Sequence, residues 1–238
     1  MSNFASPILN NCAKLVQSLL PQDCLLCGAA AGAGKLCPAC LAHLPYHPAP
    51  GCPVCAIPTT RGEVCGQCLK KPPAYDTTVA AFSYVFPLDA LIQALKYGGN
   101  LAAVSALAQP LLERVAVEPR PDLLIPMPLF PTRLRERGFN QSMELAKPLA
   151  RALDVPLAVD SAERIRDTAP QASLPLKERR SNIKGAFGCN ADLSGKSVAI
   201  VDDVMTSGAT LDELARTLRR RGAARISAWV VARGLMHK

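Results

Sequence analysis

A segment near the C-terminus, residues 198–210, places the strongest constraint on how this chain can fold. It starts with the apolar run 198–201, continues with the acidic pair Asp202–Asp203, and ends in a small, hydroxyl-rich turn. Apolar runs of this kind are typical of strands buried on both faces of a parallel sheet. The turn would open a helix, whose N–H groups, hydroxyls and positive end suit a phosphate. Open α/β sheets bind ligands at the carboxyl ends of their strands, so the acidic pair favours a ribose phosphate there, with its vicinal hydroxyls.

These thirteen residues resemble the phosphoribosyl-pyrophosphate (PRPP) motif of type I phosphoribosyltransferases. In that family the loop holds the sugar phosphate and the acidic pair reaches the ribose hydroxyls, which implies the second role for Asp202 and Asp203. The resemblance implies the first role for Thr206, Ser207, Gly208, Ala209 and Thr210. A generic strand–turn–helix with a capping hydroxyl is the alternative. Rossmann and P-loop folds are excluded, because the chain has neither G-x-G-x-x-G nor G-x-x-x-x-G-K-[ST].

Cysteine spacing defines a second, smaller part of the chain. Eight of the ten cysteines form four C-x-x-C pairs, and the second two pairs repeat the first two with a displacement of 28 residues. Leu41 and Leu69 match under the same displacement. The pattern predicts an internal duplication of a small unit with two cysteine knuckles. The pairs are Cys24/Cys27, Cys37/Cys40, Cys52/Cys55 and Cys65/Cys68.

Two knuckles can complete a tetrahedral four-cysteine site, and a unit this small needs bound metal to be stable. We therefore expect two structural Zn²⁺ ions in a double zinc ribbon, with a disulfide scaffold as the alternative. The duplication favours consecutive pairing of the knuckles, Cys24 to Cys40 and Cys52 to Cys68, while a cross-braced arrangement stays open. A catalytic zinc is disfavoured, because sulfur would fill all four positions of each site. Support of the fold or docking of a protein partner is the expected role.

Charge and hydropathy narrow the class of protein. The net charge of +8 suits polyanionic ligands, either phosphorylated small molecules or nucleic acid. No apolar run reaches the roughly 18 residues of a membrane span. The N-terminus lacks a basic region, and Lys14 interrupts its apolar stretch, so no signal peptide is expected. These features predict a cytoplasmic, reducing location, in which spaced cysteines bind metal more often than they form disulfides.

Three regions are expected along the chain: an amphipathic helix over 1–20, the double zinc ribbon over 21–73, and an α/β domain over 74–238. Lys70–Lys71–Pro72–Pro73 marks the second boundary. The alternation of elements in the last region predicts a mostly parallel sheet with helices on both faces. Its strands are expected at 79–85, 122–127, 155–159, 198–201 and 226–232, and its helices at 88–97, 101–115, 140–153 and 209–221.

Three basic segments add candidate ligand contacts. A Pro-rich loop after the strand 122–127 carries three arginines, and the arginine fork suits pyrophosphate. A long polar segment over 164–187 is typical of a lid that closes on a ligand. Lys96 lies at a helix end before Gly98–Gly99. The alternative for the Pro-rich loop is a solvated basic loop. For 164–187 it is a plain loop with a surface helix, and for Lys96 it is a charge that caps the helix. The arginines in question are Arg133, Arg135 and Arg137 in the first segment and Arg179 and Arg180 in the second.

Together these features resemble the ComF family, phosphoribosyltransferase-like proteins with an N-terminal zinc ribbon. The resemblance runs from the first C-x-x-C pair to the C-terminus. It rests on the cysteine pairs, Leu95–Lys96–Tyr97, Pro126–Met127–Pro128, Arg137–Gly138–Phe139–Asn140–Gln141, Gln171 with Arg179 and Asn182, and the PRPP motif. Membership implies a link to natural transformation, in which imported single-stranded DNA is handled beside a helicase-like competence protein.

If the chain is an enzyme, the resemblance implies glycosyl transfer from PRPP with Mg²⁺. Asp202, Asp203 and Arg179 would then be catalytic, while the turn residues, the three loop arginines, Lys96 and Arg180 would bind substrate. The domain also resembles that of the glutamine amidotransferase that starts purine synthesis, but residue 2 is Ser2, so no N-terminal cysteine nucleophile for a glutaminase exists. A non-catalytic adaptor that binds a nucleotide or single-stranded DNA for a DNA-translocating helicase is the alternative. The nucleophile cannot be identified from the residues.

Overall fold

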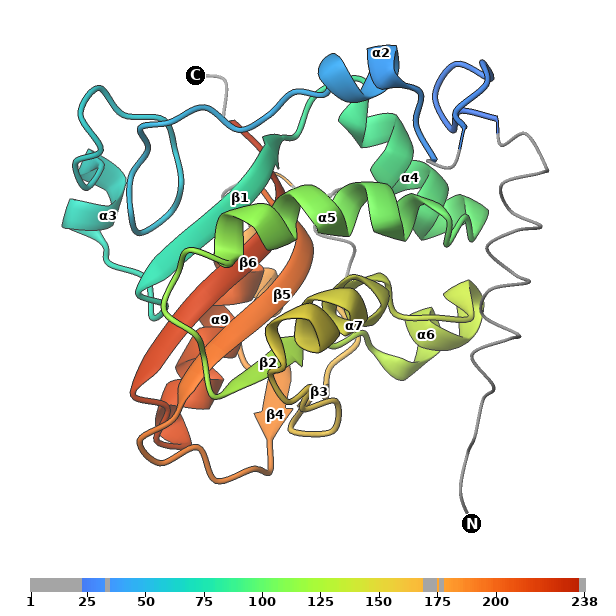
Figure 1. Ribbon diagram of the computed structural model, residues 1–238. Helices are drawn as coiled ribbons and strands as arrows, with labels where there is room; N and C mark the ends of the chain where they lie inside the picture. Colours follow the sequence, from blue (N-terminus) through green and yellow to red (C-terminus); the bar gives the residue numbers. More distant parts are fainter. Residues whose placement is uncertain (1–22, 33–34, 169–174, 176–177, 236–238) are drawn as a thin grey trace. The chain divides into compact units, whose positions relative to one another are not determined.

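The computed structural model describes residues 23–32, 35–168, 175 and 178–235 (Figure 1). The helix predicted over 1–20 and the motif residue Gln171 lie outside the described residues. The chain divides into two compact units between Leu44 and Pro45. The first unit holds the first cysteine repeat, and the second unit holds the second repeat with the whole α/β region. This division falls between the two repeats, whereas the sequence pattern places the end of the ribbon at residue 73.

The two cysteine repeats have the same backbone structure. Helix α2 (Pro38–Ala42) in the first repeat and helix α3 (Gly66–Lys70) in the second are 28 residues apart. Each repeat also has one isolated antiparallel bridge at equivalent positions, Asp23 with Ala30 and Gly51 with Pro58. The turn after the first knuckle requires a left-handed residue in both, Gly28 with φ 73° and Ala56 with φ 57°. The predicted duplication is therefore present in the fold itself.

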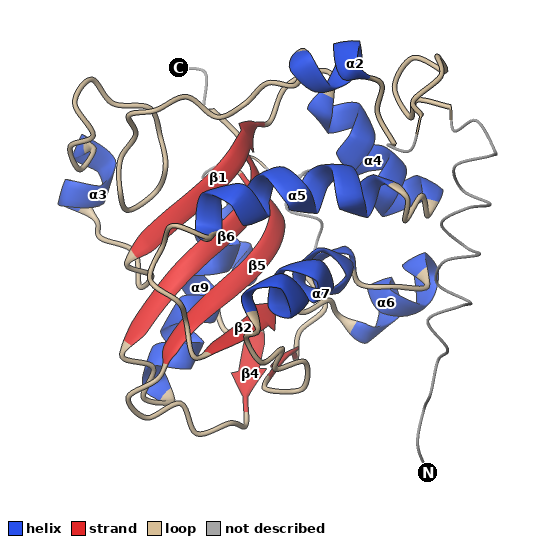
Figure 2. Cartoon of the chain, viewed as in Figure 1, coloured by secondary structure: helices blue, strands red, loops and turns tan. Residues whose placement is uncertain are grey.

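The core of the second unit is a four-stranded parallel sheet in the order β1–β6–β5–β2 (Figures 1 and 2). The central strands are buried along nearly their whole length, which explains their continuous apolar sequences. Strand β5 stays paired with β6 past the acidic pair, as far as Met205 opposite Arg233. The strands are β1 (Thr77–Ser83), β2 (Leu123–Pro126), β5 (Ser197–Met205) and β6 (Arg225–Arg233).

Helices cover both faces of this sheet. Helices α5 (Ala103–Val115) and α7 (Gln141–Leu153) lie on one face, with α4 (Leu88–Gly98) packed against α5. Helix α9 (Ala209–Arg220) lies on the other face, where its leucines join the core of β5 and β6. The predicted mostly parallel α/β sheet with helices on both faces is confirmed. Within the described residues, no helix combines the length and apolarity needed to cross a bilayer.

Two predicted elements differ from the structure. The strand expected at 155–159 is reduced to a single bridge between Leu124 and Leu157, because Pro156 has no N–H to give to a ladder. The arginine-bearing loop is instead a short helix, α6 (Pro131–Arg137), with proline at its start and left-handed Gly138 at its end.

The long polar segment also contains regular structure. Strand β3 (Ala162–Arg164) pairs antiparallel with β4 (Phe187–Cys189), and helix α8 (Arg179–Ile183) lies between them in sequence. Residues 169–174 and 176–177 lie outside the described residues, so the predicted lid stays a prediction.

Candidate functional site

The hydroxyl-rich turn joins the carboxyl end of β5 to the start of α9, as the sequence predicts. Gly208 precedes the helix with φ 74°, and a Cβ there would lie 2.8 Å from Met205 Cε and 2.9 Å from Tyr75 Oη. Only glycine fits this conformation and this space. The turn and the end of β5 line a small hollow of about 60 Å³, which Asp202 shares. Backbone N–H groups at a helix start beside such a hollow are suited to a phosphate.

The two acidic residues have different environments, although both are buried. Asp202 Oδ1 accepts from Ser142 Oγ (3.0 Å) and from the Asp203 N–H (2.9 Å). Burial and the neighbouring Asp203 carboxylate raise the pKa of Asp202 to about 7. Asp203 Oδ2 forms an ion pair with Lys96 Nζ at 2.7 Å, and its Oδ1 accepts from the Val204 N–H at 2.7 Å. Asp203 is therefore paired with the Lys96 ammonium, whereas Asp202 takes up a proton near neutral pH.

Lys96 is more than a charge at the end of a helix. Its ammonium reaches from the last turn of α4 to Asp203, across the carboxyl edge of the sheet. Burial works to lower the pKa of Lys96, but the Asp203 carboxylate outweighs that effect and the pKa lies above its ordinary value. Lys96 is thus a fixed cation at the proposed ligand edge.

A second hollow, of about 170 Å³, lies between the end of α4 and α6. Lys96, Arg133 and Arg137 line it, and the Arg137 guanidinium lies 5.5 Å above the Tyr97 ring. Arg135 is exposed, lines no described hollow and donates to Thr132 Oγ1 at 3.5 Å. The structure therefore brings together two of the three predicted arginines.

The two arginines predicted from the polar segment, Arg179 and Arg180, have different neighbours. Arg179 Nη1 donates to Thr206 Oγ1 at 2.8 Å, so α8 contributes a cation directly at the turn. Arg180 instead lines a separate hollow of about 290 Å³ with Arg216 and Glu213 of α9. Arg179 is thus hydrogen-bonded to the turn, while Arg180 lines a hollow together with Ala209 at the start of α9.

The run Arg137 to Gln141 has a structural explanation. Gly138 ends α6 in a left-handed conformation, and the side-chain oxygen of Asn140 caps α7 by accepting from two backbone N–H groups. The Asn140 amide also donates to the Met127 carbonyl at 3.0 Å, while Arg137 donates to Gln141 Oε1. These contacts set the start of α7, from which Ser142 reaches Asp202.

Ser142 and Arg164 are site residues that the sequence reasoning did not single out. The buried Arg164 Nε has no hydrogen-bond partner among the described residues, and the guanidinium lies 5.9 Å above the Phe187 ring. Burial, and then the charge of Arg133, lower the pKa of Arg164, while Asp202 acts in the opposite direction. The Arg164 guanidinium also donates to Thr168 Oγ1. Its position in a segment rich in basic residues was the available signal.

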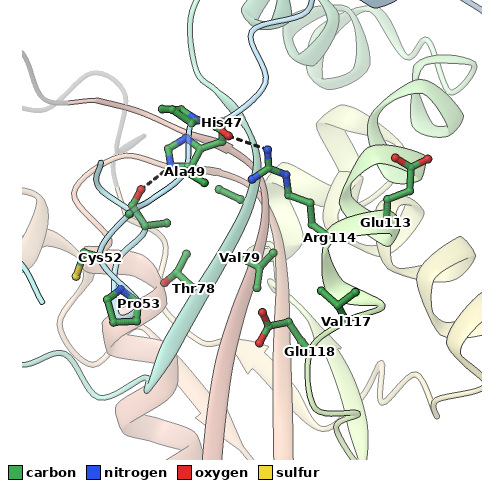
Figure 3. A pocket seen from close by; sticks show the side chains of 14 residues that line it. His47, Ala49, Cys52, Pro53, Thr78, Val79, Glu113, Arg114, Val117 and Glu118 are labelled. Atoms are coloured by element: carbon green, nitrogen blue, oxygen red, sulfur yellow. Dashed lines mark hydrogen bonds between the residues drawn. The ribbon is translucent and has the colours of Figure 1, made fainter. Parts of the chain in front are cut away.

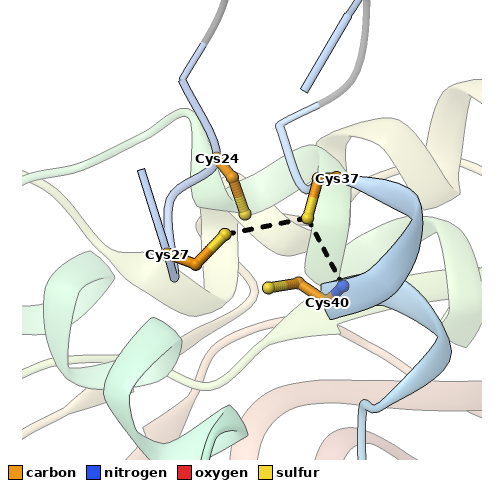
Figure 4. A group of neighbouring side chains, drawn as sticks. All are labelled: Cys24, Cys27, Cys37 and Cys40. Atoms are coloured by element: carbon orange, nitrogen blue, oxygen red, sulfur yellow. Dashed lines mark hydrogen bonds between the residues drawn. The ribbon is translucent and has the colours of Figure 1, made fainter. Parts of the chain in front are cut away.

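The cysteines form two four-residue clusters with the consecutive grouping (Figure 4 shows the first). Four sulfurs about 2.3 Å from one zinc ion lie roughly 3.8 Å apart. The Sγ atoms of Cys27 and Cys37 are 3.7 Å apart and those of Cys55 and Cys65 are 3.6 Å apart. Both clusters thus fit a tetrahedral zinc ion in ligand type, number and spacing. They are Cys24, Cys27, Cys37 and Cys40, and Cys52, Cys55, Cys65 and Cys68.

A hollow of about 530 Å³ lies beside the second cysteine repeat rather than at the acidic pair (Figure 3). Buried His47 bridges its upper wall, donating from Nε2 to the Ala56 carbonyl at 2.5 Å, while Arg114 donates to the His47 carbonyl at 2.7 Å. These bonds join the second repeat to α5 through His47, whose backbone N–H also donates to the carbonyl of Ala81 in β1. The hydrogen bonds of His47 and Arg114 therefore hold this wall of the hollow together.

A parallel sheet with this turn and acidic pair, joined to two four-cysteine clusters, defines a phosphoribosyltransferase-domain protein with a double zinc ribbon. Residues 140–236 match the phosphoribosyl transferase domain family, and residues 15–69 match the double zinc ribbon domain family. The chain is 39% identical over 191 residues to the DNA utilization protein YhgH of Escherichia coli O157:H7, covering 77% of this chain and 84% of that protein. The chain belongs to the ComF/YhgH family.

Two further relatives carry competence in their names. Competence protein F of Haemophilus influenzae is 36% identical over 178 residues, 71% of this chain and 78% of that protein. Competence protein ComFC of Bacillus subtilis is 27% identical over 210 residues, 84% of each chain. Among solved structures, a purine phosphoribosyltransferase from Pyrococcus horikoshii is 21% identical, covering 66% of this chain and 87% of that one, with a TM-score of 0.33. That TM-score is too low to support any inference from that enzyme.

Proposed function

We propose that the carboxyl edge of this sheet binds PRPP with Mg²⁺, or a related ribose phosphate. One observation carries the proposal: the acidic pair, the turn that opens α9 and the Lys96 ammonium meet at the same edge. A ribose phosphate has a group for each of these features, since the turn suits its phosphate and carboxylates suit its hydroxyls.

In this proposal the turn residues 206–210 hold the sugar phosphate through their N–H groups and hydroxyls. Asp202 and Asp203 receive the ribose hydroxyls. Lys96 with Arg133 and Arg137 faces the pyrophosphate, and Arg179 reaches the phosphate from α8. Mg²⁺, when bound, would neutralise pyrophosphate charge, because Mg²⁺ is usually held by substrate oxygens and few carboxylates.

For a transferase, these residues would act by positioning and by charge. The bond from the anomeric carbon to pyrophosphate breaks, the nucleophile bonds to that carbon, and the pyrophosphate departs with the electron pair. The carboxylates of Asp202 and Asp203 favour positive charge developing on the ribose, and the cations favour the leaving group.

Calorimetric titration of PRPP and Mg²⁺ into the zinc-replete protein tests the binding proposal. Wild-type protein should bind saturably, and Asp203→Asn should weaken binding about tenfold or more through loss of a charged hydrogen bond. Asp160→Asn makes the same chemical change at an exposed position and serves as the control. Equal affinity in wild type and Asp203→Asn would remove Asp203 from the site, and no binding by the wild type would refute the proposal.

We further propose a role in DNA uptake and natural transformation in the cytoplasm; the relatives that support it are named DNA utilization protein and competence protein. The net charge of +8 favours a polyanionic partner. The alternative within this role is a non-catalytic adaptor that binds a nucleotide or single-stranded DNA beside a helicase-like competence protein.

Two assays separate the enzyme from the adaptor. Pyrophosphate release on adding PRPP with candidate bases or amines supports a transferase. Single-strand binding that weakens steeply with salt, without pyrophosphate release, supports the adaptor, because phosphate contacts release counterions.

A further inference from the structure

We propose that Arg233 is a positioning residue that makes ligand affinity at the phosphate turn depend on the second four-cysteine site and not on the first. The inference rests on the proposed function for the identity of the ligand. The connection between the cysteine site and the turn rests only on contacts within this chain.

Arg233 ends strand β6 and is 2% exposed. Its Nε donates to the carbonyl of Cys55 at 2.7 Å, and its Nη1 donates to the carbonyls of Met205 at 3.0 Å and Thr206 at 2.5 Å. One guanidinium thus bonds to a knuckle of the second four-cysteine cluster and to the start of the phosphate turn. Because the guanidinium is planar and rigid, it fixes the distance between these two backbone segments.

A buried charge makes this connection strong. Burying a cation is costly unless hydrogen bonds satisfy it, and here the partners are backbone carbonyls from both segments. If the knuckle moves, Arg233 either loses the Cys55 carbonyl as an acceptor or follows it and weakens its bonds to the Met205 and Thr206 carbonyls. The turn cannot then keep its geometry independently of the knuckle.

Tyr75 forms a second, independent connection. It is 5% exposed, and its Oη lies 2.9 Å from the position of a Cβ on Gly208, against the turn. Tyr75 belongs to the same buried cluster of side chains as Cys55 and Cys68. The same ring therefore lies between the cysteine cluster and the residue that opens α9.

The segment that leaves the second repeat also holds α9. The Ala74 N–H donates to Asp212 Oδ1 at 2.8 Å, and Arg219 Nε donates back to the Ala74 carbonyl at 3.2 Å. Arg219 also forms an ion pair with Asp76 at 2.5 Å. Both ends of α9 are thus fastened to residues that directly follow the second repeat.

The first four-cysteine cluster provides a matched control. It has the same fold and sulfur spacing, but it lies in the other compact unit, and every bond described above joins residues of the second unit. Cys40 and Cys68 occupy equivalent positions 28 residues apart. Cys40→Ser and Cys68→Ser therefore make the same chemical change, and Cys68 is the one that lies in the unit holding these bonds.

The experiment measures zinc content, PRPP–Mg²⁺ affinity by calorimetry, and hydrogen exchange of peptides covering 205–210 in the full-length protein. Each serine variant should retain one zinc. Cys68→Ser should weaken PRPP binding about tenfold and speed exchange at 205–210, whereas Cys40→Ser should stay within about twofold of wild type. Coupling is reciprocal at equilibrium, so saturating PRPP should tighten zinc binding at the second site.

Arg233→Lys tests the connection even if Cys68→Ser does not fold. It keeps the charge but loses the fork, so it should retain both zinc ions while exchange at 205–210 becomes faster. The buried Trp229 on β6 reports by its fluorescence whether the sheet is intact. Wild-type exchange and affinity in both Arg233→Lys and a folded Cys68→Ser would overturn the inference. If wild type does not bind PRPP, the proposed function fails, and the exchange data alone decide whether the connection exists.

Discussion

Asp202→Asn should stabilise this protein at alkaline pH, although Asp202 lies at the proposed ligand site. The wild-type carboxyl is buried beside Asp203, and its pKa is raised from 3.8 to about 7. Asparagine has nearly the same shape, and its carbonyl oxygen can still accept from Ser142 Oγ and the Asp203 N–H. The substitution therefore removes a buried negative charge without removing these hydrogen bonds.

The direction follows from proton linkage. Unfolded Asp202 ionises near 3.8 and folded Asp202 near 7, so the folded state binds more protons between these values. Ionisation therefore costs stability, the cost is complete above pH 7, and it disappears as the pH falls toward 3.8. Applied to this shift, linkage gives a cost of about 4 kcal/mol at pH 8 and about 2 kcal/mol at pH 5.5.

Urea unfolding of zinc-replete wild type and variant at both pH values measures this difference. We expect Asp202→Asn to be the more stable protein at pH 8, with the advantage roughly halved at pH 5.5. Differences between the two proteins cancel any zinc loss that they share at the lower pH. Asp160→Asn, at an exposed position, should show no such pattern. A variant that is less stable than wild type at pH 8, or a difference independent of pH, would refute the reasoning.

Three further outcomes follow from named contacts. Lys96→Met should lower the unfolding free energy by about 3 kcal/mol, because it leaves the buried Asp203 carboxylate unpaired. Adding Asp203→Asn should restore part of the lost stability. No recovery in the double variant would contradict the pairing. Asn140→Ala should cost about 1–2 kcal/mol in urea unfolding, since it removes the cap of α7 and the bond to Met127; an unchanged midpoint would contradict this. Strong chelation should release two zinc ions per chain, detected with a colorimetric metal indicator, and should remove hydrogen-exchange protection at 52–68; release of one ion, or none, would contradict the two-site interpretation.

Local patterns in the sequence were enough for much of the fold. The helix over 88–97 is expected to end at Gly98–Gly99, and α4 ends at Gly98 with left-handed Gly99 as its cap. The helix expected over 140–153 is also present, as α7, and Asn140 is its N-terminal cap. The failures are also local: Pro156 interrupts a run that otherwise reads as a strand, and Pro131 with Gly138 encloses a helix too short for a periodic signal.

The sequence by itself determined the parts of the candidate site that lie within one segment. The strand, the acidic pair, the turn and the cysteine repeat are each encoded by neighbouring residues, because propensity, metal-ligand spacing and turn geometry act over short distances. Contacts between segments far apart in the chain were decided only by the tertiary structure. Lys96 meets Asp203, Ser142 meets Asp202, and Arg233 meets Cys55, because parallel strands bring their carboxyl ends to one edge whatever their order in the chain. No local pattern can specify such a pair, since each partner is chosen by the packing of the whole sheet.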